Sequence, residues 1–228
     1  NHAMPENLMD NLRLLAPVAR PINYMLKGYY ARFHSKADFV TLPTQSAIDM
    51  FYDTNKMTMP IAAASNGIDL CRYKVGTPSA ELLGRFAIPT DRPLITYIGR
   101  VDAEKHLFVL IRAFVRVLAH KDAHLLIVGD GTDVANLKVL TQELGVLEHV
   151  TFTGRVSDDD PAALHQVGTV YCMPSPAGLQ SIATLAALAS GQPIVAFDPG
   201  ARSACCPEGA QGLLRREARA AESATVFL

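Results

Sequence analysis

Apolar residues between Pro93 and Phe197 alternate between two spacings along the chain. Apolar positions three and four residues apart are typical of one buried helix face, whereas short runs rich in β-branched residues are typical of strands. The runs predict five strands, at 94–98, 125–128, 150–152, 169–172 and 193–197. The helical spacing predicts helices near 107–118, 134–144, 161–167 and 179–189. Because uninterrupted apolar strands between helices are buried on both faces, we predict an α/β fold with a doubly wound parallel sheet.

The residues before Pro93 show a shorter series of the same kind. They predict strands at 39–43 and 61–64, helices at 44–52 and 77–87, and a turn-rich boundary at 89–93. We interpret this segment as the end of a second α/β domain.

Residues 201–228 are rich in Ala, Arg and Glu, predict no strand after Phe197 and allow a helix over 213–221. The predicted division is therefore 1–70, a linker at 71–92, a main domain at 93–200 and an aberrant tail at 201–228.

Composition narrows the class of protein. The 228 residues are 49% hydrophobic and 19% charged, which supplies a core and excludes a disordered chain. The formal net charge of −1 argues against a general nucleic-acid binder. Four cysteines without metal-ligand spacing, and the lack of a long apolar run, predict a cytoplasmic location. Since the chain opens with Asn1 and not with methionine, we expect a piece of a longer protein.

The end of the first main strand carries two cations. Gly99 permits a tight exit from the strand, and Arg100 and Lys105 follow it. Ligands of open parallel sheets bind beyond the carboxyl ends of the strands, and Arg and Lys bind phosphate. The pair is suited to stabilise a diphosphate leaving group without a metal. The alternative is a solvated helix start with Lys105 on its exposed face, and the spacing does not decide between them.

Gly129-Asp130-Gly131 after the second strand suggests a dinucleotide site, but Val134 stands where the fingerprint needs a third glycine. A tight turn with Asp130 or Thr132 as helix cap is the favoured interpretation. The residues after the fourth strand, 174–178, lead to a helix start whose free amides suit a phosphate oxygen.

Other polar residues are assigned structural roles. Asp158-Asp159-Asp160 before Pro161 fits ordinary helix-start chemistry, so no metal site is predicted. Five histidines share no spacing and are predicted to lie at the surface or at helix caps: His106, His120, His124, His149 and His165.

Residues 11–37 combine basic and aromatic side chains. Five basic residues and no acidic one occur there, with tyrosines and a phenylalanine interleaved. Such a stretch suits an anionic membrane surface. An ordinary solvated helix face is the alternative, and the two remain open.

An ordered set of motifs runs from residue 65 to residue 196. The motifs are Ser65–Asp69, Tyr97–Lys105, Val128–Gly131, Phe152–Gly154, Pro174–Ser175 and Ala189–Ala196. In order and spacing they resemble the family 4 (group 1) retaining glycosyltransferases of GT-B architecture. Residues 1–7 also resemble the active-site loop of the lipid-glycosylating branch, which includes diacylglycerol glucosyltransferase-like proteins.

The resemblance implies two Rossmann-like domains, with 1–70 ending the acceptor domain and 93–200 forming the nucleotide-sugar (donor) domain. It implies transfer from a nucleotide-diphosphate sugar with retention, without a cofactor or catalytic metal, at a cytoplasmic or inner-membrane position; it predicts no oligomeric state. The implied roles are a catalytic position near the reacting sugar for His2, diphosphate contacts for Gly99, Arg100 and Lys105, and a nucleotide border at Gly129, Gly131, Arg155 and Val156.

Two departures from the family pattern stand out. The family has two glutamates eight positions apart, one for the sugar hydroxyls and one for the ribose, and here those positions are Gly178 and Ala186. Each loss should weaken donor binding by about 1–3 kcal/mol. The second departure, after Ala201, suggests a shifted reading frame near Arg202 or a partial gene. Three alternatives to a glycosyltransferase stay open: a non-catalytic module that binds a nucleoside diphosphate, a nicotinamide oxidoreductase and a sugar epimerase.

Overall fold

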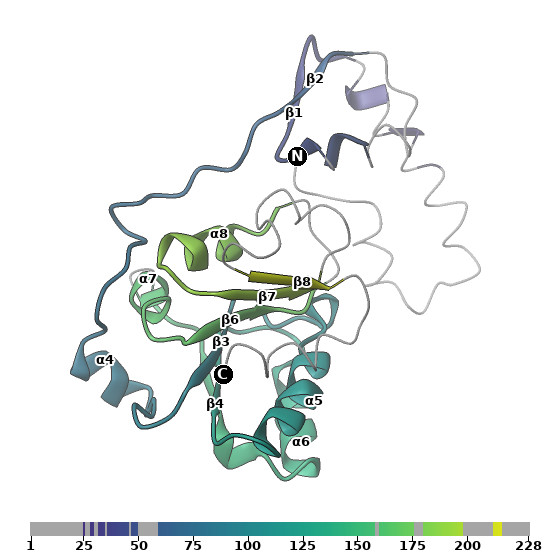
Figure 1. Cartoon of the computed structure of the whole chain (residues 1–228). Helices are drawn as coiled ribbons and strands as arrows, with labels where there is room; N and C mark the ends of the chain where they lie inside the picture. Colours follow the sequence, from purple (N-terminus) through teal and green to yellow (C-terminus); the bar gives the residue numbers. More distant parts are fainter. Residues whose placement is uncertain are drawn as a thin grey trace. The chain divides into compact units, whose positions relative to one another are not determined.

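The computed structural model describes residues 25, 28–29, 32–34, 36–45, 47–49, 59–157, 160–175, 180–197 and 212–215. The chain divides into two compact units (Figure 1). Unit 1 comprises 1–67, 177–180 and 200–205, and unit 2 comprises 68–176, 181–199 and 206–228. The candidate donor residues that fall within the described ranges all belong to unit 2.

Unit 1 contains a pair of parallel strands. The strands β1 (Val40–Leu42) and β2 (Ile61–Ala63) pair along their whole length, which confirms the two strands predicted before Pro93. The helical residues that follow β1 begin after Thr44, whose Oγ1 accepts a hydrogen bond from the amide of Ala47 at 3.1 Å. Thr44 is therefore the N-cap of the helix predicted at 44–52.

Unit 2 is built on a parallel six-stranded sheet. Its strands are β3 (Leu94–Ile98), β4 (His124–Val128), β5 (Val150–Gly154), β6 (Val170–Met173), β7 (Ile194–Phe197) and β8 (Gly212–Arg215). Their order in the sheet is β5-β4-β3-β6-β7-β8, and all neighbours are parallel. The order reverses between β3 and β6, so the carboxyl edge near this point is where such a sheet binds ligands.

Strand β8 corrects the prediction for the tail. Gly212–Arg215 pairs in parallel with Ile194–Phe197, so a strand does follow Phe197 and no helix begins at Leu213. Local composition favours a helix in this Ala- and Arg-rich stretch, but pairing with β7 fixes an extended backbone. The series of parallel strands thus continues beyond the point where the sequence predicts its end.

Helices cover both faces of the sheet. They are α4 (Ala80–Arg85), α5 (Leu107–Leu118), α6 (Val134–Glu143), α7 (Asp160–Leu164) and α8 (Ile182–Ala189), with short 3-10 turns at Ala103–Lys105 and Leu147–His149. Figure 1 shows α5 and α6 on one side of the sheet and α7 and α8 on the other. Every helix predicted between Pro93 and Phe197 is therefore confirmed, with shifts of a few residues at the ends. None of the described helices is long and apolar enough to cross a bilayer.

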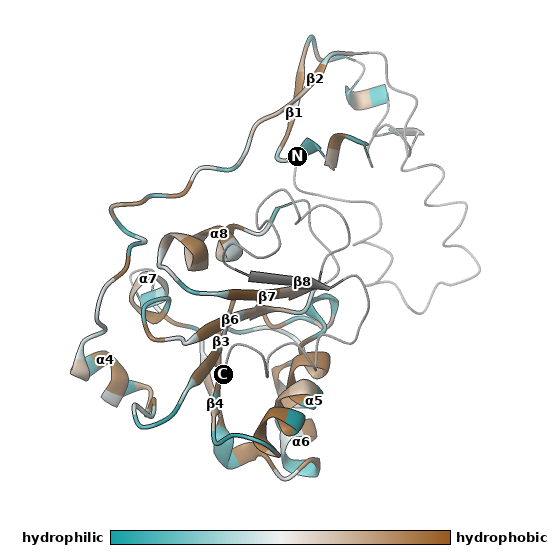
Figure 2. Ribbon diagram, in the orientation of Figure 1, coloured by the Kyte–Doolittle hydropathy of each residue, from teal (hydrophilic) through white to brown (hydrophobic). Residues whose placement is uncertain are grey.

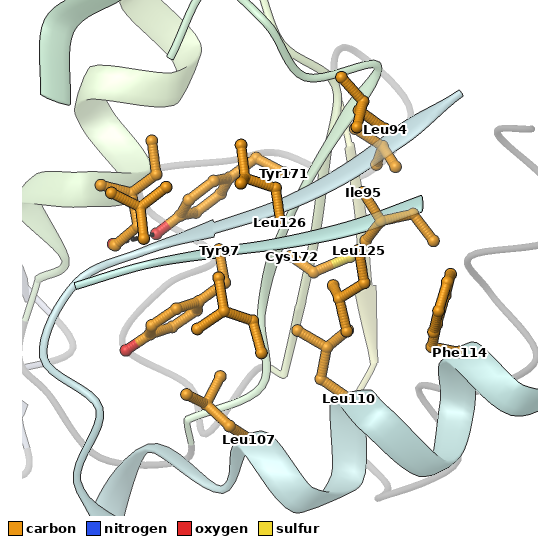
Figure 3. Close-up of a cluster of buried hydrophobic side chains, with 14 of the residues drawn as sticks. Leu94, Ile95, Tyr97, Leu107, Leu110, Phe114, Leu125, Leu126, Tyr171 and Cys172 are labelled. Carbon is orange, nitrogen blue, oxygen red and sulfur yellow. Dashed lines mark hydrogen bonds between the residues drawn. The ribbon is translucent and has the colours of Figure 1, made fainter. Parts of the chain in front are cut away.

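The core of unit 2 lies between α5 and the central strands. Every residue of β3 and β4 is buried, and both strands lie in the apolar band of Figure 2. Figure 3 shows Leu107, Leu110 and Phe114 of α5 pointing toward the sheet, beside Tyr97 and Leu125. Burial of this apolar layer fixes the strand ends that carry the polar side chains.

Two histidines contradict the prediction of surface or cap positions. His124 and His165 are 7% and 1% exposed. Nε2 of His124 lies 2.8 Å from Oγ1 of Thr151, and Nδ1 of His165 lies 3.2 Å from Oε1 of Gln192. Burial lowers the pKa of each imidazole to about 4. Neither residue belongs to a periodic apolar pattern, so the sequence gives no sign of their burial.

Candidate functional site

A pocket of about 550 Å³ opens beyond the carboxyl ends of β3, β4 and β5. Six residues expected at a donor site line it: Gly99, Arg100, Gly129, Gly131, Arg155 and Val156. The rest of the lining comes from Ile98, Val128, Asp130 and Pro161. Residues from three strand ends thus meet in one cavity, as their shared edge of the sheet requires.

Backbone hydrogen bonds tie these strand ends together. The amide of Gly99 donates to the Val128 carbonyl at 3.0 Å, and the amide of Gly129 donates to the Gly154 carbonyl at 3.2 Å. At Gly129 the backbone has φ +127°, and a Cβ there would stand 2.0 Å from the Gly99 carbonyl oxygen. Glycine is required because the two loops approach so closely. Hence the glycines serve a tight turn, as the sequence favours.

The helix cap predicted at this turn is wrong. Asp133 is the residue at the N-cap of α6, and it makes no side-chain cap hydrogen bond. Asp130 instead accepts a hydrogen bond from the amide of Gly131 through Oδ1. Thr132 donates both its amide and its hydroxyl to Oδ1 of Asp102, at 3.1 Å each. The turn after β4 is thereby tied to the loop after β3.

Arg100 stands at the mouth of the pocket between two carboxylates. Its Nη1 donates to Oδ2 of Asp102 at 2.6 Å, and its Nη2 donates to Oε1 of Glu104 at 2.7 Å. The Arg100 side chain is 68% exposed. Its carbonyl accepts a hydrogen bond of 2.7 Å from the hydroxyl of Tyr97. The backbone of Arg100 is thus anchored to the core, while its guanidinium faces solvent.

Lys105 reaches this group without lining the pocket. Its Nζ lies 3.0 Å from Oε1 of Glu104, the same oxygen that binds Arg100. The side chains of Glu104 and Lys105 are 7% and 21% exposed. The hydroxyl of Ser175, after β6, donates to the carbonyl of Glu104. Glu104, which the sequence analysis did not single out, therefore joins the two predicted cations.

Arg155 is a second cation in the pocket wall. It is exposed, and within the described part of the chain it makes no ion pair or side-chain hydrogen bond.

Asp160 begins α7 and accepts hydrogen bonds from the amide and hydroxyl of Ser157. These bonds and the ion pair with Arg85 lower the pKa of Asp160. This contact confirms the helix-start interpretation for Asp160; Asp158 and Asp159 lie outside the described residues.

The residues implied for the sugar are only partly within the described ranges. Ala186 lies in α8 and is 2% exposed, and its methyl group cannot accept a hydrogen bond. Gly178 and His2 lie outside the described residues. At the start of α8 the hydroxyl of Ser181 accepts a hydrogen bond from the amide of Thr184. The helix start proposed for a phosphate oxygen thus has at least one amide already bonded.

The motif at 65–67 makes a specific contact within unit 1. Oε1 of Gln180 accepts a hydrogen bond from the amide of Asn66 at 2.8 Å, and Nε2 of Gln180 donates to the hydroxyl of Ser65 at 2.9 Å. The motif that begins at Ser65 is therefore joined to Gln180, a residue far away in the sequence, through one amide side chain.

Comparison with known proteins identifies relatives of the chain. The model of the family "Glycosyl transferases group 1" matches residues 79–225. The alpha-monoglucosyldiacylglycerol synthase of Streptococcus pneumoniae is 25% identical over 180 residues, which are 77% of this chain and 40% of that protein. A GDP-mannose-dependent alpha-(1-6)-phosphatidylinositol monomannoside mannosyltransferase of Mycobacterium tuberculosis is 29% identical over 195 residues, or 82% of this chain and 49% of its own length. The chain thus spans less than half of these relatives.

Solved structures show the same fold. Anabaena HepE in complex with UDP-glucose superposes with a TM-score of 0.78 at 20% identity, covering 88% of this chain and 56% of HepE. Sucrose-phosphate synthase from Thermosynechococcus elongatus gives a TM-score of 0.76 at 21% identity, over 88% of this chain and 51% of its own. The GT-B, Rossmann-like fold is therefore confirmed. The family match also runs past Arg202 to residue 225 and includes β8, which counts against a shifted reading frame there.

Proposed function

The chain belongs to the group 1 glycosyl transferases, and on that premise we propose that the pocket of unit 2 binds the nucleotide diphosphate of a sugar donor. In the whole protein the sugar is transferred to an acceptor with retention. The observation that carries the proposal is the meeting of six expected donor residues in one pocket. Support comes from HepE, which shares the fold and was solved with UDP-glucose.

The pocket suits a departing diphosphate for electrostatic reasons. Negative charge grows on the diphosphate as the sugar bond breaks, so groups that bind this charge lower the barrier. Arg100 can donate two parallel hydrogen bonds to a phosphoryl group, and Arg155 is a second cation in the wall of the pocket. Gly129 lets the loops after β3 and β4 approach each other closely, which brings the pocket residues of both loops together. The proposal includes no catalytic metal and no cofactor. It keeps His2 as a catalytic residue near the reacting sugar.

Donor binding can be tested by titrating the chain with UDP and with GDP in a calorimeter. Replacing Arg100 by Met removes a charged hydrogen-bond donor, so we expect the dissociation constant to rise by roughly 10- to 100-fold. Arg112→Met on the exposed face of α5 is the matched control and should leave binding unchanged. Equal affinities for the two variants would contradict a diphosphate site at Arg100.

Gly178 and Ala186 favour a second candidate, a module that binds a nucleoside diphosphate but does not transfer sugar. Replacing each by Glu distinguishes the two. The glutamate that meets the ribose should tighten binding of both the nucleotide and the nucleotide sugar, by about 1–3 kcal/mol. The glutamate that meets the sugar should tighten only the nucleotide sugar. If neither variant alters the affinity for a nucleotide sugar while UDP or GDP still binds, the non-catalytic module is supported.

For the acceptor we propose a lipid at an anionic membrane surface, so that the protein is cytoplasmic and peripheral. The described residues among 25–34 are helical, and Met25, Tyr29 and Phe33 follow one another at intervals of four, on one helix face. Their exposed fractions are 72%, 65% and 61%. The rings of Tyr29 and Phe33 stack with centroids 6.4 Å apart. Large exposed apolar side chains among basic residues favour a membrane surface over an ordinary solvated face.

Flotation with vesicles tests this surface. The chain should float with vesicles that contain phosphatidylglycerol and less with pure phosphatidylcholine, and about 1 M salt should weaken the binding because it screens the charges. Phe33→Ser should reduce flotation, because it removes apolar area that the protein would bury in the membrane on binding. Val139→Ser, at an exposed position of α6, is the control. Equal flotation of both variants would exclude the proposed face.

A further inference from the structure

The loop after β3 carries its own anions beside its cations. Between residues 100 and 105, the basic Arg100 and Lys105 flank the acidic Asp102 and Glu104, and the four side chains form one connected group. Two positive and two negative formal charges cancel. Without a ligand, the cations proposed to bind diphosphate are therefore already occupied by carboxylates.

The exposed fractions show which member of this group can move. Glu104 is 7% exposed, and Asp102, with 19% exposed, is held by two hydrogen bonds from Thr132 through its other oxygen. Lys105 is 21% exposed. The side chain of Arg100 is 68% exposed, and the backbone carbonyl of Arg100 accepts the hydrogen bond from Tyr97. Hence the guanidinium of Arg100 is the part that can turn toward a ligand.

We propose that Asp102 and Glu104 act as an internal anion that competes with the phosphoryl groups of the donor for Arg100 and so lowers the affinity of the pocket for its ligand. The inference rests on the proposed function of this pocket. A ligand must offer Arg100 more than two carboxylates already supply. Glu104 keeps Lys105 in place during this exchange.

Asp102→Asn isolates the competition. Asn retains an Oδ1 that can accept both hydrogen bonds from Thr132, and it replaces the oxygen that faces Arg100 by an amide nitrogen. We expect UDP and GDP to bind roughly two- to fivefold more tightly, within the range of exposed ion pairs. The corresponding monophosphates should gain no more than the diphosphates, because the freed Arg100 is available equally to each ligand. Asp122→Asn, at an exposed ion pair with Arg92, makes the same change in net charge and is the control.

Two further variants complete the test. In the Arg100→Met background, Asp102→Asn should give no gain, because the competition acts through Arg100. Glu104→Gln should also tighten the binding of UDP and GDP, and thermal melting would verify that each variant is folded. Unchanged affinities for Asp102→Asn and Glu104→Gln, or a gain that persists with Arg100→Met or appears equally in Asp122→Asn, would overturn the inference while leaving the diphosphate site intact. Failure of the unaltered chain to bind UDP and GDP would overturn both.

Discussion

At the scale of single residues, Gly129 has the most demanding surroundings in the pocket. The left-handed region of the backbone and the close Gly99 carbonyl both exclude a side chain there. We predict that Gly129→Ala lowers the free energy of unfolding by about 3 kcal/mol, from strain and from the forced separation of two loops. Gly84→Ala in α4 is the control, because a Cβ there meets open space and alanine favours a helix. Urea denaturation measures both, and equal effects would contradict the argument.

His165 makes the stability depend on pH. Its pKa is about 4 in the folded protein and near 6.5 when unfolded, because burial excludes the charged form. The unfolded chain thus binds more protons as pH falls below 6.5, and the associated stability, fully present above that pH, is lost down to about pH 4. We expect His165 alone to account for about 2 kcal/mol of destabilisation between pH 7.5 and pH 5.

Urea denaturation at a series of pH values checks this expectation. His165→Gln should flatten the profile, and the slope that remains should reflect His124, whose pKa is lowered in the same direction. His120→Gln, at an exposed position, should not change it. A profile of the same steepness for His165→Gln and the unaltered chain would contradict the assignment.

The predictability of the site varies from residue to residue. Gly99 and Arg100 were predictable because they follow an apolar run that ends at the carboxyl edge of the sheet, whereas the pocket positions of Gly129, Gly131, Arg155 and Val156 were implied by the family resemblance. Glu104 and Asp102 were not, since a carboxylate beside an arginine is common on any surface and only burial distinguishes it. The signal that could have found them is the presence of two acidic residues between the basic Arg100 and Lys105.

At the scale of elements, α5 and β8 show what sequence patterns can and cannot predict. The buried residues of α5 recur three and four apart, so the helix and its buried face follow from the sequence. Strand β8 has four residues and owes its conformation to hydrogen bonds with β7. Such pairing is non-local, which explains why a composition favouring a helix gave a wrong prediction there.

The packing of α5 leads to a prediction at this scale. Phe114 is fully buried between α5 and the sheet, whereas Phe108 is 43% exposed on the same helix. Truncating a buried phenylalanine removes apolar contacts and leaves a cavity, so Phe114→Ala should cost about 3–5 kcal/mol. Phe108→Ala should cost far less, although the two changes have the same effect on helix propensity. Thermal melting measures the loss of stability in both variants, and equal losses would contradict the assignment of Phe114 to the core.

At the scale of the whole molecule, the described cores of the two units differ greatly in extent. In unit 1 the buried cluster consists of Leu42, Ala47 and Ile48 with Ile61 against it, whereas in unit 2 it extends through all the central strands. Because local stability follows buried apolar contact, we expect the strands of unit 1 to open at a lower free energy than those of unit 2. Amide hydrogen exchange, followed by segment, measures this difference directly.

A ligand that binds only to unit 2 should widen that difference. At a concentration about 100 times the dissociation constant, UDP or GDP raises the free energy of opening of the unit that it binds by about 2.7 kcal/mol. The amides of β3 and β4, whose ends line the pocket, should therefore exchange roughly 100-fold more slowly, while those of β1 and β2 keep their rates. At the same ligand concentration, Arg100→Met should reduce the protection of β3 and β4 to roughly 2- to 10-fold. Slowed exchange in β1 and β2 alone would place the nucleotide in unit 1, because stabilisation appears where the ligand binds.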